Sequence, residues 1–242
     1  MTMAASFHFD EGVLLCADRL ITHGRPSSPD SFGSYQEKIW EMTCRGFSLA
    51  ITGAGTTAAL KAIADKTMQT LQQEQGPDEE FCQLPAGMIE AALKEAVDEV
   101  HEGFDPQTDS ADVLLAVNQY VSGITVTRNT GRIISRVGTS DIVGIGENSL
   151  IGFLVNNLYR ARMNQTQITA FAALLVHEAK TYCPQYCGGQ TDIKILKRGF
   201  RGVLTVPAAT VGVFEIFFHE HAKDHLNNLL HDAIQFVDRS CK

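Results

Sequence analysis

The order of strand and helix patterns is the feature of this sequence that most constrains its fold. The chain begins with strand patterns, which are followed by two helix patterns and a second block of strands. Two more helices, two strands and a final helix complete the order. A doubly wound sheet needs single strands and helices in alternation, so these blocks argue against it. Two facing sheets, each with a helix pair on its outer side, would bury all the apolar faces. We therefore predict an α+β fold with residues 2–242 as a single domain.

The strand predictions rest on short apolar runs bounded by turn residues. We expect strands at 6–9, 13–18, 38–42, 47–52, 113–118, 123–127, 132–137, 142–146, 192–196 and 202–206. Tight turns are predicted at 10–12 and 129–131, where a glycine ends each turn. A loop rich in Pro, Ser and Gly is predicted from residue 23 to residue 34.

The helix predictions rest on apolar residues that recur near one face of a 3.6-residue period. We expect helices at 56–73, 85–101, 149–163, 166–182 and 222–237. Gly76 and Pro77 stop the first of these, and Pro85 stands in the first turn of the second, where proline is tolerated.

Composition excludes several classes of function. The chain has 242 residues and a net charge of -8, with no run rich in Lys or Arg. Partners with anionic surfaces, both nucleic acids and membranes, are therefore disfavoured. We expect neither a secretory signal nor a membrane span, because no uninterrupted apolar run reaches about 18 residues. The six cysteines lack CxxC spacing. We predict that they are reduced and that the protein is cytoplasmic.

Thr2 is a candidate nucleophile because of its place next to the initiator Met1. A small second residue generally permits removal of the methionine, which would leave a free α-amine on Thr2. A threonine hydroxyl is a weak nucleophile until a base takes its proton. The α-amine, with an ordinary pKa of about 8, is a candidate base on the same residue. Threonine is a common second residue, so the neighbouring sequence must carry the argument.

The segment from Thr2 to Asp18, TMAASFHFDEGVLLCAD, resembles the opening of proteasome β subunits. In that family a terminal threonine starts a strand, a hairpin turns it, and a second strand ends in an acidic residue at the same spacing. Further resemblance lies in QEKI around Lys38, in FSLAITGAG up to Gly55, in IVGIGENSLIGFLV and in YCGGQTDIKIL. The order and spacing of these stretches together are more specific than any one of them.

This resemblance implies a four-layer αββα sandwich of the N-terminal nucleophile (Ntn) hydrolase type. It implies a threonine-type peptidase in which Thr2 attacks the peptide bond and Lys38 lowers the pKa of its hydroxyl. Asp18 would keep Lys38 charged, and the Gly53 N–H would stabilise the oxyanion. The resemblance further implies no cofactor and no metal, peptides or unfolded polypeptides as substrates, and self-assembly into a ring that encloses the sites. It leaves a regulatory ATPase as an open question.

Three positions depart from active members of that family. Ile145 stands where the family has Ser, Pro184 where it has Asp, and Cys187 where it has a second Ser. These groups normally orient the amine and its proton relay. A catalytically silent subunit that serves as a ring scaffold is therefore one alternative function, and an Ntn amidase acting on small molecules is another.

Three histidines near the predicted final helix offer a weaker signal. His221 and His225 have the i,i+4 spacing that can hold a metal on a helix, and His219 lies close by. No wider motif accompanies them, so we interpret them as part of a polar helix face.

Overall fold

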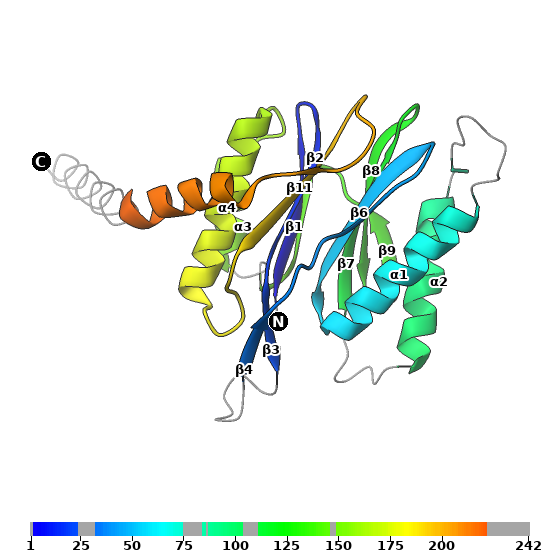
Figure 1. The fold of residues 1–242 in the computed structure, drawn as a ribbon, viewed down its shortest axis with the longest axis horizontal. Helices are drawn as coiled ribbons and strands as arrows, with labels where there is room; N and C mark the ends of the chain where they lie inside the picture. Colours follow the sequence, from blue (N-terminus) through cyan, green and yellow to red (C-terminus); the bar gives the residue numbers. More distant parts are fainter. Residues whose placement is uncertain are drawn as a thin grey trace, which may run out of the picture.

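A computed structural model describes residues 2–23, 32–74, 84–85, 87–103, 111–145 and 149–221 (Figure 1). Its strands are β1 (Met3–Phe9), β2 (Gly12–Asp18), β3 (Leu20–His23), β4 (Phe32–Tyr35), β5 (Trp40–Thr43), β6 (Phe47–Gly55), β7 (Ala111–Gln119), β8 (Gly123–Thr130), β9 (Ile133–Arg136), β10 (Ser140–Gly144), β11 (Thr191–Lys197) and β12 (Leu204–Thr205). Its helices are α1 (Thr57–Gln73), α2 (Met88–Gly103), α3 (Ser149–Leu158) and α4 (Gln165–Tyr182), and residues 208–221 are also helical.

The described strands form three antiparallel sheets. One has five strands in the order β10-β1-β2-β11-β12, another has five in the order β5-β6-β7-β8-β9, and β3 and β4 form a two-stranded sheet. In the first sheet Ala4 pairs with Ala17, and Asp18 pairs with Thr191. The β1–β2 hairpin therefore returns the end of β2 to the start of β1, beside Thr2.

The core divides into three clusters that follow the alternation of side chains along each strand. Met3, Ala5, Phe7 and Phe9 point from β1 towards α3 and α4, while Ala4 belongs to a cluster between the two five-stranded sheets. A third cluster joins α1 and α2 to the sheet β5–β9. Figure 1 shows the two helix pairs on opposite outer sides of the sheets. Apolar clusters therefore lie on both faces of each large sheet.

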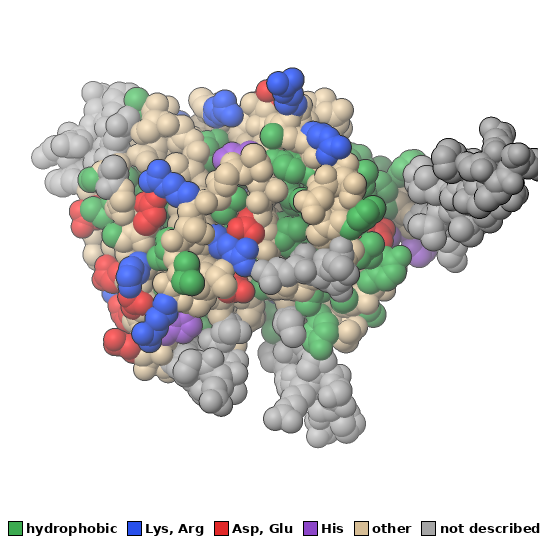
Figure 2. Space-filling model, turned by 180° about the vertical axis from the view of Figure 1, so that it is seen from behind, with side chains coloured by type: hydrophobic (Ala, Val, Ile, Leu, Met, Phe, Trp, Pro, Cys, Tyr) green, Lys and Arg blue, Asp and Glu red, His purple; other side chains and the backbone are tan. Residues whose placement is uncertain are grey.

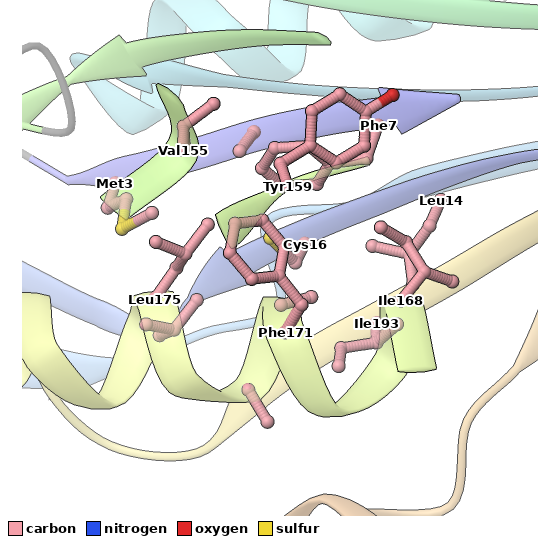
Figure 3. Packing of buried hydrophobic residues seen from close by; sticks show 14 of the residues in the cluster. Met3, Phe7, Leu14, Cys16, Val155, Tyr159, Ile168, Phe171, Leu175 and Ile193 are labelled. Carbon is pink, nitrogen blue, oxygen red and sulfur yellow. The ribbon is translucent and has the colours of Figure 1, made fainter. Parts of the chain in front are cut away.

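Aromatic rings anchor the cluster under α3 and α4 (Figure 3). The Phe7 ring lies 5.3 Å from the Tyr159 ring and 5.4 Å from the Phe171 ring, between centroids. The Tyr159 hydroxyl donates to the carbonyl oxygens of His8, at 2.6 Å, and Thr139, at 2.8 Å. These bonds hold Tyr159 against β1, and α3 ends just before it at Leu158, five residues before the predicted end at 163.

The predicted start of α4 is off by one residue, and a capping box explains where the helix begins. The Asn164 side chain accepts from the Gln167 N–H at 2.9 Å, and the Gln167 side chain accepts from the Asn164 N–H at 3.0 Å. Such reciprocal caps satisfy two of the otherwise unpaired donors of a first turn.

The predicted loop at 23–34 is wrong in part, because its flanks form the hairpin of β3 and β4. The turn predicted at 129–131 is also shifted: β8 continues to Thr130, and Gly131 turns the chain with a φ of +58°. The strand predicted from Lys38 begins instead at Trp40. Lys38 precedes this strand, and its side chain points into the cluster described below.

Sequence analysis did not predict the helix at 208–221, and the helix predicted at 222–237 lies outside the described residues. The missed segment is rich in Val, Ile and Phe, which favour strands. Packing decides in favour of a helix, since Val211, Phe214 and Phe218, at i, i+3 and i+7, contact the cluster under α4.

Candidate functional site

Thr2 lies at the start of β1 and is 2% exposed. Its carbonyl oxygen accepts from the Ile145 N–H at 3.1 Å. Gly144 pairs with Met3 and has a φ of +79°, and a Cβ on Gly144 would lie 2.0 Å from the Thr2 oxygen and 2.6 Å from the Ala54 side chain. Only glycine can therefore bring the end of β10 this close to Thr2.

Asp18 ends β2 and is fully buried. Its Oδ1 accepts from the Thr2 hydroxyl and from the Met3 N–H at 3.0 Å. Its Oδ2 accepts from the Leu20 N–H at 2.9 Å and the Gly188 N–H at 3.2 Å. These fixed donors hold the carboxylate in one orientation towards Thr2.

Lys38 is 2% exposed and completes the cluster from the other side. Its ammonium donates to the Thr2 Oγ1 and to the Leu20 carbonyl oxygen, and it lies 3.4 Å from each Asp18 oxygen. Burial lowers the pKa of Lys38, and the negative charge of Asp18 opposes that effect. The Thr2 hydroxyl therefore stands between a buried ammonium and a buried carboxylate.

Gly53 is less closely tied to this cluster. It lies in β6, and a Cβ there would stand 2.2 Å from the Asp112 carbonyl oxygen and 2.6 Å from a Leu60 methyl carbon. The close approach of β7 and α1 thus accounts for the glycine by packing. A Cβ added to Gly144 would meet both Ala54, the next residue, and the Thr2 carbonyl oxygen, so this stretch of β6 lies near Thr2. The predicted oxyanion role of Gly53 stays a prediction.

Ile145 and Cys187, two of the three positions that depart from the family, border the same cluster. Cys187 is buried, and burial followed by the negative charge of Asp18 raises the pKa of its thiol. A thiol with a raised pKa is a poor nucleophile. The Ile145 backbone binds Thr2 as described, and residues 184–186 form the turn that leads from α4 to Cys187.

Backbone groups of Leu20 and Gly188 complete the site, and the sequence prediction missed them. The Gly188 carbonyl oxygen accepts from the N–H groups of Arg19, at 3.2 Å, and Leu20, at 3.1 Å, while the Gly188 N–H binds Asp18. Arg19 in turn binds Asp192 through both carboxylate oxygens. Backbone donors carry no residue signature, and the Gly188–Gly189 pair within the resembling stretch is the only sequence signal for them.

Two further features bear on ligands and surroundings. Across the described ranges no group of three or more His, Cys, Asp or Glu side chains could hold a metal ion. His219 and His221 lie in the 208–221 helix, and His225 lies outside the described residues. Within the described part of the chain, no helix is long and apolar enough to cross a membrane.

Comparisons with known proteins define the fold class. No family model matches the chain, and no curated protein matches its sequence. Among solved structures, the chain resembles Anbu proteins, one of which is described as an ancestral beta-subunit. The fold is therefore proteasome-β-like, and the resemblance in the sequence is confirmed at the level of the fold.

Three of these structures show how far the likeness extends. The Anbu (Gly-1) mutant from Hyphomicrobium sp. strain MC1 has a TM-score of 0.74 at 13% identity, over 95% of this chain and 99% of that chain. Anbu from Yersinia bercovieri has a TM-score of 0.72 at 14% identity, over 93% of this chain and 96% of that chain. The helical assembly of the Anbu complex from Pseudomonas aeruginosa has a TM-score of 0.71 at 12% identity, over 93% of this chain and 96% of that chain. At such identities the likeness shows the fold alone.

Proposed function

We propose that this chain is a threonine-type peptidase with Thr2 as its N-terminal nucleophile. The observation that carries the proposal is the position of the Thr2 hydroxyl between the Lys38 ammonium and the Asp18 carboxylate. A buried positive charge next to a hydroxyl lowers the pKa of that hydroxyl, and the carboxylate keeps the lysine charged. Chain segments far apart in sequence converge on this single hydroxyl.

In the proposed reaction, removal of Met1 frees the α-amine of Thr2, which accepts the hydroxyl proton directly or through water. Thr2 Oγ1 attacks the carbonyl carbon of a peptide bond, and the Gly53 N–H donates to the resulting oxyanion. The bond to the amide nitrogen breaks, and the amine product leaves with the proton. Water then hydrolyses the ester on Thr2 and restores the hydroxyl.

The finer description of the fold belongs to the same proposal. We infer a single domain with the four-layer αββα sandwich of Ntn-hydrolases. The arrangement of one core cluster between the large sheets and one under each helix pair supports it. The two sheets bring Thr2 and Asp18 from one side together with Ala54 from the other.

Self-association is the second part of the proposal. Three apolar side chains of the 208–221 helix are largely exposed: Val213 by 65%, Ile216 by 60% and Phe217 by 53%. Figure 2 shows hydrophobic side chains gathered towards the side from which this helix projects, with most charged side chains farther away. Neighbouring apolar side chains of this kind mark interaction surfaces. The helical assembly of the similar Anbu complex supports self-association, and closure into a ring is the form we propose.

A silent scaffold subunit is the rival function, and three positions favour it. Ile145, Pro184 and Cys187 stand in place of the expected polar residues.

Hydrolysis assays with matched variants test the proposal. The purified protein should cleave an unfolded polypeptide, and Thr2→Ala should abolish cleavage. Thr181→Ala, which alters an exposed threonine at the end of α4, should leave it unchanged. Cleavage that survives in Thr2→Ala would exclude Thr2 as the nucleophile. Cleavage of small amides alone would point to the amidase alternative.

A further inference from the structure

Lys194 is a buried lysine that the proposed mechanism does not use. It lies in β11, its side chain is 8% exposed, and its Nζ is 3.1 Å from Glu37 Oε1 and 2.9 Å from Glu41 Oε2. Burial alone would lower the pKa of Lys194, but the hydrogen bonds and charges of the two glutamates outweigh burial and raise it. The two carboxylates therefore favour the charged form of Lys194.

The two glutamates flank the segment that carries Lys38. Glu37 directly precedes Lys38, and Glu41 follows in β5, which belongs to the other large sheet. Glu37 pairs with Lys194, while Lys38 next to it contacts Thr2 and Asp18.

The same strand also holds the residue next to Asp18. Asp192 and Lys194 are two residues apart and share one face of β11. Asp192 pairs with Arg19, the residue after Asp18, at a shortest N–O distance of 2.6 Å. The strand itself pairs with β2 through Thr191 and Asp18. One strand therefore fixes the chain immediately next to both charged groups of the site.

We propose that Lys194 is a positioning residue that sets the place and the charge state of Lys38 by holding Glu37 and Glu41. This inference rests on the proposed function for its kinetic consequence. The positioning itself follows from the ion pairs that cross from β11 to the Lys38 segment.

Lys194→Met keeps the length and apolar stem of the side chain and removes the charge. The reaction of Thr2 should slow by about tenfold to 100-fold, since small displacements of a catalytic group have effects of that size.

The groups that face Lys38 are Asp18, Asp192 and Cys187, and Glu37 adjoins it. Loss of the Lys194 charge leaves Glu37 unneutralised, which favours the charged form of Lys38. The alkaline limb of the pH–rate profile should therefore move to higher pH.

The test compares the rate of reaction with an epoxyketone peptide, as a function of pH, in the wild type and three variants. Lys194→Arg keeps the charge and should restore the wild-type alkaline limb. Lys197→Met is the matched control, because Lys197 lies on the same strand and pairs with the half-exposed Glu11. Its rate and profile should not change. A Lys194→Met profile with the wild-type alkaline limb would overturn the inference, whatever the absolute rate.

A second measurement separates failure of the inference from failure of the proposed function. If the wild type forms no adduct, the peptidase proposal fails, and amide hydrogen exchange at residues 36–41 decides the inference by itself. Faster exchange in Lys194→Met than in Lys197→Met supports the positioning role. Equal exchange in the two variants overturns it.

Discussion

At the scale of residues, the site depends on two charges that are buried together. Asp18 is fully buried and Lys38 is 2% exposed, with Nζ 3.4 Å from both carboxylate oxygens. Removal of one partner of a buried ion pair leaves the other charge desolvated and uncompensated. Each group is therefore needed to keep the other in place.

Asp18→Asn should lower the free energy of unfolding at neutral pH by about 3–5 kcal/mol, because it leaves the Lys38 charge unpaired. Asp65→Asn is the matched control, since the Lys61–Asp65 pair is more than half exposed and should contribute little. Urea unfolding of both variants measures the difference. Equal stabilities would mean that Asp18 does not hold Lys38.

The deficit of Asp18→Asn should shrink as the pH rises. Burial lowers the pKa of Lys38 in the folded protein below its ordinary value of 10.5. Between the folded and the unfolded pKa, the unfolded chain binds more protons than the folded protein, so the free energy of unfolding rises with pH. Loss of Asp18, which opposes this lowering, moves the start of the rise to lower pH. Unfolding curves at several alkaline pH values would show the two proteins converging, and a constant gap would contradict the assignment to Lys38.

The spacing of Thr2, Asp18 and Lys38 in the sequence indicates that these side chains meet, whereas the backbone groups around them leave almost no signal in the sequence. Thr2, Asp18 and Lys38 carry distinctive side chains at a recognisable spacing, and the structure brings them together. The N–H of Gly188 and the carbonyl of Leu20 reach the site only through tertiary packing. Their catalytic importance, like that of the side chains, stays a prediction.

At the scale of elements, the ends of strands position the site. The β1–β2 hairpin was predictable from its short apolar runs and its turn, whereas β3 and β4 flank a stretch with the composition of a loop. The 208–221 helix was missed because β-branched and aromatic residues favour strands until packing on α4 is known. Local propensity and tertiary packing disagree at that segment, and packing decides.

Gly144→Ala tests the approach of β10 to Thr2. The new Cβ would meet the Thr2 carbonyl oxygen at a position with φ of +79°, so we expect destabilisation by at least about 2 kcal/mol. Gly152→Ala in α3 is the control, since a Cβ there meets no neighbour, and it should be neutral or stabilising by up to about 1 kcal/mol. Urea unfolding separates them, and similar values would refute the close approach.

At the scale of the whole molecule, the chain has a proteasome-β-like fold, and the helix at residues 208–221 exposes apolar side chains. The fold class followed from the order of elements, because blocks of strands and helices restrict how apolar faces can be buried. Exposed side chains such as Ile216 could not be recognised from sequence, since buried and exposed apolar residues look alike there.

Ile216→Glu should weaken self-association, because it puts a charge into the surface that we propose to meet another copy. Val121→Glu is the control: Val121 is 68% exposed but lies in the turn between β7 and β8. Sedimentation of both variants and the wild type should show a smaller assembly for Ile216→Glu alone. Unchanged assembly would place the interface elsewhere.

The most direct test of the central claim is the intact mass of the purified protein before and after treatment with an epoxyketone peptide. That probe needs both a hydroxyl nucleophile and a free α-amine on the same residue to form its ring adduct. We predict a protein that lacks Met1 and gains one adduct on Thr2, with no adduct in Thr2→Ala. Retention of Met1 without an adduct would contradict the peptidase claim and leave a proteasome-β-like fold without that chemistry.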